Sequence, residues 1–444
     1  MNALWTSAEL RTATGGRLMA ELAVARVGFD SRQLRPGDLF VALRAVRDGH
    51  DFVAAAFAAG AAAAMVEHGD DPRALVVPDT LAALHAIGAA GRARAGAKVV
   101  AVTGSVGKTT TKEMLRIALG AFGHTHAAAA SFNNHIGVPT TLANLAPDAA
   151  FAAIEIGMNS RGEIAPLARL TRPHVAIISN IGTAHLGRLG SQAEIAAEKG
   201  DIMLGLEPGG TAVLPAESPF LNTLRRRADR VLTFGAGAAA ADVRLLEHAD
   251  RLSRIATPAG EVTLRLTAPG RHLAENACAV LAAVHALGLD VRQAATALAL
   301  FDQGAGRGQR RAIAVPGGGA TLLDESYNAS EASVLAALSV LKSHNGRRVA
   351  VLGDMLELGP DGAAMHESLA PAVAASADLV HTVGPLMEGM LRLLPPGLQG
   401  LAATDSADLA APMRASLRPG DAVLVKGSLG MQMALLIQAL DPPS

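Results

Sequence analysis

Short apolar runs alternate along this chain with stretches whose apolar residues recur at helical spacing. In the middle of the sequence the apolar runs fall at residues 99–102, 151–156, 175–181, 211–214 and 231–234. Continuous apolar runs of this length are typical of parallel strands covered on both faces, and helices between them form βαβ units. The pattern predicts an α/β fold whose central part is a doubly wound, mostly parallel sheet.

The same alternation predicts a further α/β domain on each side of the central sheet. The N-terminal one is small, with expected strands at 39–43, 61–66 and 74–77 and a helix followed by a linker at 84–97. The C-terminal one is Rossmann-like, with expected strands at 312–315, 348–352, 379–383 and 422–425 and a helix at 331–342. A glycine-rich, basic segment at 302–311 is interpreted as a hinge. We therefore expect domains at 1–96, 97–311 and 312–444.

The composition narrows the range of functions. Half of the 444 residues are hydrophobic and the formal net charge is −1, which leaves no electrostatic footprint for nucleic acid or an anionic membrane. The single Cys278 excludes an intramolecular disulfide and suits a reducing compartment. The N-terminus lacks the pattern of a signal peptide, and the alanine-rich run at 53–66 is too short to span a bilayer. We expect a cytoplasmic monomer that acts on small molecules.

The candidate chemistry begins where the strand at 99–102 ends. Gly104 and Gly107 allow the backbone to bend close to a ligand, and the helix that follows carries Lys108 and Thr109 in its first turn. Backbone N–H groups there can cradle a phosphate, the lysine adds charge, and the threonine hydroxyl can bind Mg²⁺. A strict P-loop has a glycine where this chain has Val102, so this is a shortened variant; a glycine turn with a surface lysine is the alternative. The candidate nucleotide-binding residues are Gly104, Ser105, Val106, Gly107, Lys108, Thr109 and Thr110.

Polar residues follow the other apolar runs. Glu155 ends a strand beside the presumed phosphate site, where its carboxylate can hold Mg²⁺ or merely cap a neighbouring group. His185 closes another strand and is either a metal ligand or a structural histidine. Asn276 shares a helical face with His272 and can contact a base or ribose, or only satisfy the helix start. Spacing alone favours Lys199 as a solvated lysine near a helix end.

Three loop clusters in the N-terminal region, at 30–32, 44–47 and 48–50, follow strand ends, where α/β sheets bind ligands. They contain Ser31, Arg47 and His50. Ordinary polar loops are the alternative interpretation.

Several segments resemble the Mur ligases, in the right order and over nearly the whole chain. These segments are 103–109, 133–139, 155–159, 184–186 and 270–272. The segments 324–329 and 353–359 are similar to the family member that joins D-alanyl-D-alanine to a UDP-N-acetylmuramoyl tripeptide in peptidoglycan precursor synthesis. Ser160, Gly187, Ser330 and Glu331 depart from the family pattern beside these motifs.

The resemblance implies ATP and Mg²⁺ as cofactors, with Lys108, Glu155, His185 and Lys199 as catalytic residues. Lys108 and Thr109 would hold the ATP phosphates and a first Mg²⁺, and Glu155 and His185 would hold a second. Lys199 matches a position that is carbamylated in some Mur ligases, which would turn a cation into an anion. The implied nucleotide contacts are Asn276 and Arg310, with Arg307 and Arg311 as alternatives. The implied substrate contacts are Ser31, Arg47 and His50 in a UDP-sugar-binding N-terminal domain, Asn133 and Asn134, and Asp324, Tyr327 and Asn328 in the C-terminal domain.

The implied reaction is ATP-driven amide formation. The terminal carboxylate of the tripeptide attacks the γ-phosphate, which gives an acyl phosphate and ADP. The amine of D-alanyl-D-alanine then attacks the acyl carbon, and phosphate leaves. The alternatives are a sister ligase that adds a diamino acid, a P-loop kinase or transporter ATPase, and a non-catalytic nucleotide-binding protein. Because water would hydrolyse the acyl phosphate, we expect the domains to close around the reactants. Without ligands we expect an open arrangement in which Asp324 lies too far from Lys108 to share a substrate.

Overall fold

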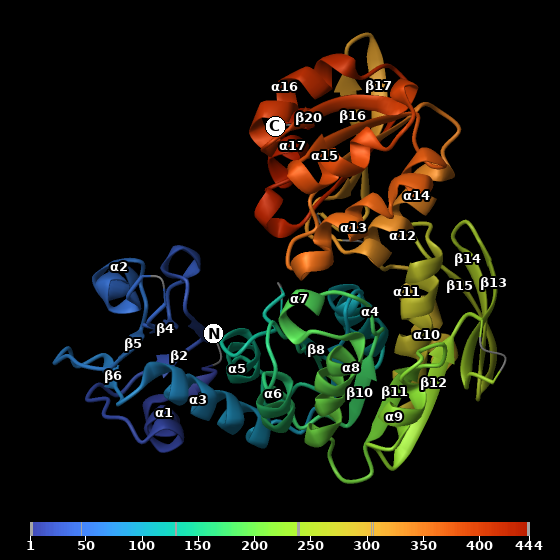
Figure 1. Ribbon diagram of the computed structural model, residues 1–444. Helices are drawn as coiled ribbons and strands as arrows, with labels where there is room; N and C mark the ends of the chain where they lie inside the picture. The colour runs from blue at the N-terminus through green and yellow to red at the C-terminus, as the bar shows by residue number, and fades with distance from the viewer. Residues whose placement is uncertain are drawn as a thin grey trace.

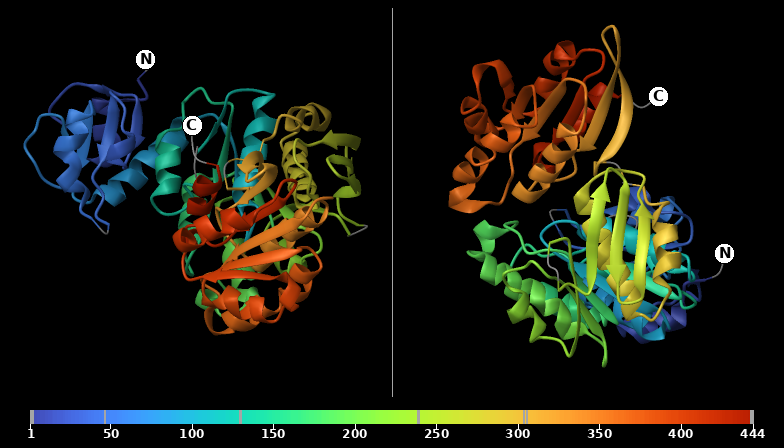
Figure 2. Two further views of the ribbon diagram at one scale, coloured as in Figure 1. Left: turned by 90° about the horizontal axis from the view of Figure 1, so that it is seen from above. Right: turned by 90° about the vertical axis from the view of Figure 1, so that its right-hand side faces the viewer.

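The computed structural model describes residues 3–45, 47–128, 131–237, 240–302, 304 and 306–441. Three α/β bodies are visible, and each has its own principal sheet (Figure 1). The N-terminal body lies beside the central one, and the C-terminal body lies over a different part of the central body (Figures 1 and 2). The fold class predicted from the apolar pattern is therefore confirmed.

The N-terminal body is built on a parallel sheet with the strand order β3-β4-β5-β6. Its strands are β3 (Arg26–Gly28), β4 (Asp38–Val41), β5 (Ala63–Val66) and β6 (Ala74–Val76), and its helices are α1 (Ser7–Thr14), α2 (Val53–Ala58) and α3 (Thr80–Arg94). The short strands β1 (Trp5–Thr6) and β2 (Ala23–Val24) form a separate antiparallel pair. A capping box formed by Thr6 and Glu9 starts α1, since each side chain accepts a hydrogen bond from the other residue's backbone N–H.

Helix packing joins the N-terminal body to the central one. In α3, Gly91 approaches the carbonyl of Leu142 in α5 (Gly137–Ala143) so closely that a side chain at Gly91 would overlap it. The indole Nε1 of Trp5 also donates to the Ala143 carbonyl at 2.8 Å. The helix expected from residue 84 begins earlier, and only residues 95–97 separate α3 from the central sheet. This contact fixes the N-terminal body against α5.

The described part of the central body contains a nine-stranded sheet with the order β15-β14-β13-β12-β11-β10-β7-β9-β8. The strands are β7 (Lys98–Thr103), β8 (Thr125–Ala127), β9 (Phe151–Glu155), β10 (Val175–Ile178), β11 (Thr211–Pro215), β12 (Arg230–Gly235), β13 (Val243–Ala249), β14 (Leu252–Thr257) and β15 (Gly260–Arg265). Seven of them are parallel, whereas β14 and β15 are antiparallel. The sequence analysis missed β13–β15, although exposed and buried residues alternate along β14 and β15 as in half-buried antiparallel strands.

Helices cover both faces of this sheet. One face packs against α4 (Lys108–Gly120), α10 (Arg271–Ala286) and α11 (Val291–Leu298), and the other against α5, α6 (Ile164–Thr171), α8 (Gln192–Gly200) and α9 (Leu221–Arg225). The short α7 (Leu186–Leu189) lies beyond the carboxyl end of β10. Cys278 is buried in α10, and burial raises the pKa of its thiol. None of the described helices is long and apolar enough to cross a membrane.

The C-terminal body has a sheet with the order β16-β17-β21-β18-β19-β20. Its strands are β16 (Gln309–Val315), β17 (Gly318–Glu325), β18 (Arg348–Gly353), β19 (Leu379–Val383), β20 (Gln399–Ala403) and β21 (Ala422–Lys426). Its helices are α12 (Glu331–Lys342), α13 (Gly362–Glu367), α14 (Ala370–Ala374), α15 (Pro385–Arg392), α16 (Ser406–Ser416) and α17 (Ala434–Leu440). Because β16 starts at Gln309, Arg310 and Arg311 belong to a strand and not to a free hinge.

The central and C-terminal bodies touch each other, so the open arrangement expected from the sequence is wrong for this structure. The helix α7 packs against the 3-10 turn Gly359–Asp361 of the C-terminal body. Arg307, which precedes β16, donates to the hydroxyl of Ser131 in the central body at 3.0 Å. Both bodies therefore contribute to the cavity described below.

Candidate active site

The turn between β7 and α4 requires glycine at two positions for two different reasons. A Cβ at Gly104 would overlap the hydroxyl of Ser179, so only glycine fits there. Gly107 precedes α4 with φ of 80°, in the left-handed region that glycine adopts without strain. The predicted strand, turn and helix are all present, and the first turn of α4 carries Lys108 and Thr109.

Residues after β10 hold this turn in place. The Val106 N–H donates to Asn180 Oδ1 at 2.9 Å, and the Ser179 hydroxyl donates to the Val106 carbonyl at 2.6 Å. The Gly182 N–H donates to Ser105 Oγ at 2.9 Å. These bonds fix the phosphate-binding backbone before any ligand arrives, which lowers the cost of binding.

Lys108 is folded back over the turn. Its Nζ donates to the Gly104 carbonyl at 2.8 Å. Burial lowers the pKa of Lys108, the Glu155 carboxylate opposes that shift, and the Arg307 guanidinium adds to it. An anion bound here would relieve both the desolvation and the repulsion between the two cations.

Oxygen and amide groups surround the carboxylate of Glu155 at the end of β9. The Thr109 hydroxyl donates to Glu155 Oε2 at 2.8 Å and lies 3.0 Å from the Ser131 hydroxyl. Asn133 Nδ2 donates to Glu155 Oε1 at 2.7 Å. Within the described ranges, no three His, Cys, Asp or Glu side chains cluster closely enough to hold a metal by themselves. One carboxylate and one hydroxyl fit Mg²⁺, which usually binds through one or two carboxylates together with substrate phosphates.

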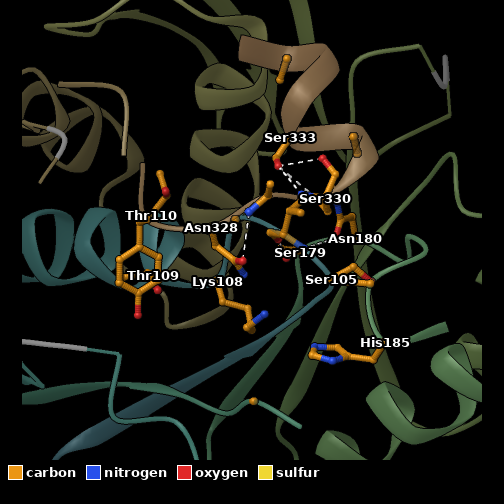
Figure 3. Close-up of a pocket in the computed structure, with 18 of the residues that line it drawn as sticks. Ser105, Lys108, Thr109, Thr110, Ser179, Asn180, His185, Asn328, Ser330 and Ser333 are labelled. Atoms are coloured by element: carbon orange, nitrogen blue, oxygen red, sulfur yellow. Dashed lines mark hydrogen bonds between the residues drawn. The ribbon is translucent and has the colours of Figure 1, made fainter. Parts of the chain in front are cut away.

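Two further predicted catalytic residues differ in their surroundings. His185 has φ of 67° and lines the cavity, with its ring directed toward Lys108 (Figure 3). Burial lowers the pKa of His185, Lys108 and Lys199 lower it further, and Glu357 opposes the shift. Lys199 is 1% exposed, so the solvated lysine favoured by spacing is wrong. Burial lowers the pKa of Lys199 well below its usual value, Lys108 adds repulsion, and the Glu198 carboxylate opposes the shift.

A cavity of about 1010 Å³ lies between the central and C-terminal bodies. Figure 3 shows Asn328, Ser330 and Ser333 on the C-terminal side and Lys108 and His185 on the central side. The predicted residues that line it are Ser105, Val106, Gly107, Lys108, Thr109, Thr110, Asn133, Asn134, Glu155, His185, Asn276, Tyr327 and Asn328. The structure therefore brings together residues that are more than 200 positions apart in the sequence.

The segment before β16 contributes Arg307 to this cavity, whereas Arg310, which lies within β16, does not line it. The Arg307 guanidinium lies 3.8 Å from the centroid of the Tyr327 ring and reaches Ser131 in the central body. Arg310 does not line the cavity; burial and the nearby Arg251 lower the pKa of Arg310, while Asp250 raises it. Of the three alternative arginines, Arg307 is the one that faces the P-loop.

Arg311 and Asp324 form an internal network. Arg311 Nη2 donates to Asp324 Oδ2 at 3.1 Å, and the Gly306 N–H donates to the same oxygen at 3.1 Å. The Ser326 hydroxyl donates to Asp324 Oδ1 at 2.6 Å. Asp324 is 2% exposed and does not line the cavity, so its predicted place on the cavity face is corrected. Its carboxylate holds the segment that carries Arg307 and Tyr327.

The predicted residues of the N-terminal body lie outside this cavity. Ser31 opens a 3-10 turn, and Arg47 is exposed. His50 Nδ1 donates to the Asp48 carboxylate at 2.6 Å, and its Nε2 accepts from the Glu67 N–H at 3.0 Å. Both ring nitrogens of His50 are therefore already bonded within the domain.

Sequence reasoning did not select several residues that line the cavity. They are Ser131, Ser179, Asn180, Glu325, Lys426 and Ser428. Lys426 is 3% exposed, and burial lowers its pKa; its Nζ donates to the Asn328 carbonyl at 3.0 Å and lies 3.5 Å from Glu325 Oε2. Lys426 and Ser428 follow the strand predicted at 422–425, so polarity at that strand end was the available signal for these two residues.

The fold and this cavity define a three-domain α/β protein with a P-loop facing a third domain. The model for the Mur ligase middle domain matches residues 102–284, the model for the Mur ligase glutamate ligase domain matches 306–429, and the model for the Mur ligase family catalytic domain matches 23–104. The chain is 39% identical, over 85% of its length and 86% of the relative, to the UDP-N-acetylmuramoyl-tripeptide–D-alanyl-D-alanine ligase of Escherichia coli. This chain belongs to the Mur ligase family.

Solved structures agree with this assignment. A crystal structure of MurF from Acinetobacter baumannii is similar, with a TM-score of 0.87, 32% identity and coverage of 98% of each chain. The MurF ligase of Thermotoga maritima in complex with ADP has a TM-score of 0.81 and 26% identity, and the match covers 94% of this chain and 97% of that one.

Proposed function

We propose that this chain is an ATP-dependent ligase that joins D-alanyl-D-alanine to UDP-N-acetylmuramoyl tripeptide in peptidoglycan precursor synthesis. Relatives named UDP-N-acetylmuramoyl-tripeptide–D-alanyl-D-alanine ligase match most of the chain at more than 30% identity. The observation that carries the proposal is the cavity in which Lys108, Thr109 and Glu155 face Arg307 and Tyr327. A nucleotide held by the P-loop would have its phosphates directed toward the C-terminal body, where a second substrate can enter.

The charges of the cavity suit the first chemical step. The tripeptide carboxylate and the γ-phosphate are both anions, and their approach is opposed by repulsion. Lys108 and Arg307 lie on opposite walls and supply positive charge to that approach. Mg²⁺, held by Thr109 and Glu155, would supply further charge neutralisation when bound.

The buried Lys199 supports a carbamate at that position. Burial and repulsion by Lys108 disfavour a bare ammonium there, and the Glu198 carboxylate only opposes these effects. Its lowered pKa favours the neutral amine, and the neutral amine is the form that reacts with carbon dioxide. The resulting carbamate would be an anion facing Lys108 and His185. In this proposal Lys199 contributes as that anion.

The C-terminal wall is proposed to bind D-alanyl-D-alanine. Asn328, Lys426 and Ser428 line it, and the buried ammonium of Lys426 is a cation on that wall. The N-terminal body is proposed to bind the UDP-sugar through the loops that carry Ser31 and Arg47. His50 holds one of these loops together, since both of its ring nitrogens are bonded.

The test is phosphate release from ATP by the purified protein. Release should require both UDP-N-acetylmuramoyl tripeptide and D-alanyl-D-alanine, and mass spectrometry should find the pentapeptide product. Single amino acids, including diamino acids with the dipeptide precursor, should give no product. Product formation with a diamino acid would instead make the chain a sister ligase, and release without any peptide would indicate a simple ATPase.

A further inference from the structure

A loop of the C-terminal body reaches the catalytic histidine of the central body. The loop follows β18 and contains Glu357, whose carboxylate oxygen Oε2 accepts a hydrogen bond from His185 Nδ1 at 3.0 Å. The other oxygen, Oε1, accepts from Arg188 Nη2 at 2.8 Å. Glu357 and His185 both line the cavity. One carboxylate therefore bridges the two bodies at the catalytic cavity.

The loop is held rigidly in its own domain. The Met355 N–H donates to Nε2 of the buried His366 at 2.8 Å, and the Leu356 N–H donates to Ser428 Oγ at 2.9 Å. Glu357 itself has φ of 66°, a left-handed conformation that glutamate rarely adopts. Such conformations persist where the surroundings impose them, and they gather at functional sites. The backbone thus presents the Glu357 side chain in one direction.

The two bodies also approach each other through glycines. A Cβ at Gly187 in α7 would lie 2.5 Å from the Gly359 nitrogen, and a Cβ at Gly359 would lie 2.7 Å from the Gly187 Cα. Side chains at either position would force the bodies apart. The lack of a side chain at Gly187 permits the close contact through which Glu357 reaches His185.

We propose that Glu357 is a positioning residue that fixes the tautomer and orientation of His185 only when the C-terminal body is closed. A carboxylate accepts from the Nδ1–H, so Nε2 carries the lone pair and is available to the cavity. Opening the domains removes Glu357 and releases the ring. The site would therefore become competent only in the closed arrangement. The catalytic role of His185 in this inference rests on the proposed function, whereas its contact with Glu357 is part of the structure.

The test uses ring-labelled histidine in the full-length protein and reads the nitrogen signals of His185 by NMR. The chain has 14 histidines, so His185→Gln identifies the signal. The variant Glu357→Asn keeps a residue that tolerates left-handed φ, but it shortens the side chain by one methylene and replaces the carboxylate with a neutral amide. The matched control is Glu367→Asn, which changes an exposed glutamate of the same domain. In the wild type we expect the Nδ1-protonated tautomer, and in Glu357→Asn a shift toward the Nε2-protonated one.

Activity gives a second readout. Glu357→Asn should lower kcat by about 10–100-fold, as changes beside a ligating histidine do, with the KM for ATP changed little. Arg188→Ala removes the other arm of the bridge but keeps the histidine contact, so it should leave the tautomer unchanged and kcat within a few-fold of wild type. Unaltered His185 signals in Glu357→Asn, or equal effects of Arg188→Ala and Glu357→Asn, would overturn the proposal and leave Glu357 as a simple tether.

A substitution on the opposite body tests the same proposal without altering the loop. Gly187→Ala should separate the bodies and reproduce the tautomer shift, whereas Gly389→Ala, at a helical glycine with open space around it, should not. A wild-type tautomer in Gly187→Ala would contradict the proposal. Wild-type protein that shows the predicted tautomer but makes no pentapeptide would overturn the proposed function alone.

Discussion

The two walls of the cavity are built in different ways. The central wall comes from consecutive strand ends, where β7, β9 and β10 run side by side and each places a polar group at the same edge. The C-terminal wall is brought to that edge by a segment before β16 and by loops after β17, β18 and β21. The central wall is therefore fixed by one sheet, whereas the C-terminal wall depends on how two bodies meet. Predictions about the first concern charge and metal binding, and predictions about the second concern domain contact.

The largest expected effect is on the central wall. Lys108→Ala should reduce phosphate release by about 10²–10³-fold or more, because it removes a preorganised charge from the reacting anions. The measurement is turnover at saturating substrates. Lys98→Ala, at an exposed lysine that begins β7, is the control and should behave as wild type. Wild-type turnover in Lys108→Ala would remove the P-loop from the mechanism.

The carboxylate at the end of β9 should come next. Glu155→Ala removes the carboxylate that accepts hydrogen bonds from the Thr109 hydroxyl and from Asn133 Nδ2. We expect kcat to fall by about 10²-fold and the Mg²⁺ concentration for half-maximal rate to rise, with ATP binding nearly intact. His185→Ala should act in the same direction. Normal turnover with reduced thermal stability in both variants would make these residues structural.

Variants of Lys199 test whether its side chain acts as a carbamate, an anion that an unmodified lysine does not carry. Lys199→Ala should be poorly active, and acetate in the buffer should partly restore turnover by replacing the carbamate. Lys199→Arg should not be rescued, because a guanidinium forms no stable carbamate. Full activity of Lys199→Arg would show that a cation is sufficient at this position.

Two arginines near the start of β16, Arg307 and Arg310, can be compared as contacts of the nucleotide. Arg307→Ala should raise the KM for ATP about ten-fold, because it removes a charge from the cavity and a cation–π contact with Tyr327. Arg310→Met should leave the KM for ATP unchanged, because Arg310 faces Arg251 outside the cavity. The reverse result would restore Arg310 as the nucleotide contact expected from the sequence.

The smallest effect concerns stability. A lysine whose folded pKa is lowered destabilises the fold at any pH below that pKa, and the cost is relieved as pH rises toward the unfolded value. Lys199→Met should therefore raise the Tm in carbon-dioxide-free buffer at neutral pH, on the order of 2–4 °C. The difference from wild type should shrink as pH rises toward that of an ordinary lysine. A Tm difference that does not change with pH would show that packing, and not charge, governs this position.

Most of the fold and the central wall could be predicted from the sequence because their signals are local. Apolar runs of four to seven residues marked the parallel strands, and polar residues at or beyond their ends, including Glu155 and His185, line the cavity. The antiparallel strands β14 and β15 were missed because their alternating pattern is weaker than a continuous apolar run.

The rest depends on contacts between distant segments. Nothing in the local sequence indicates that Lys199 is buried, that Asp324 turns inward to bind Gly306 and Arg311, or that Glu357 reaches His185. Arg307 lines the cavity and Arg310 does not, since the strand β16 starts earlier than its apolar residues indicate and includes Arg310. Spacing along the chain determines which face a residue occupies, but not which other body that face meets.

The most direct test of the account is a crystal structure with a non-hydrolysable ATP analogue and UDP-N-acetylmuramoyl tripeptide. The account predicts that the β- and γ-phosphates lie within hydrogen-bond distance of Lys108 Nζ, with the Arg307 guanidinium against the same phosphates and the tripeptide carboxylate between the two walls. Phosphates bound away from Lys108, or a tripeptide carboxylate outside this cavity, would contradict it.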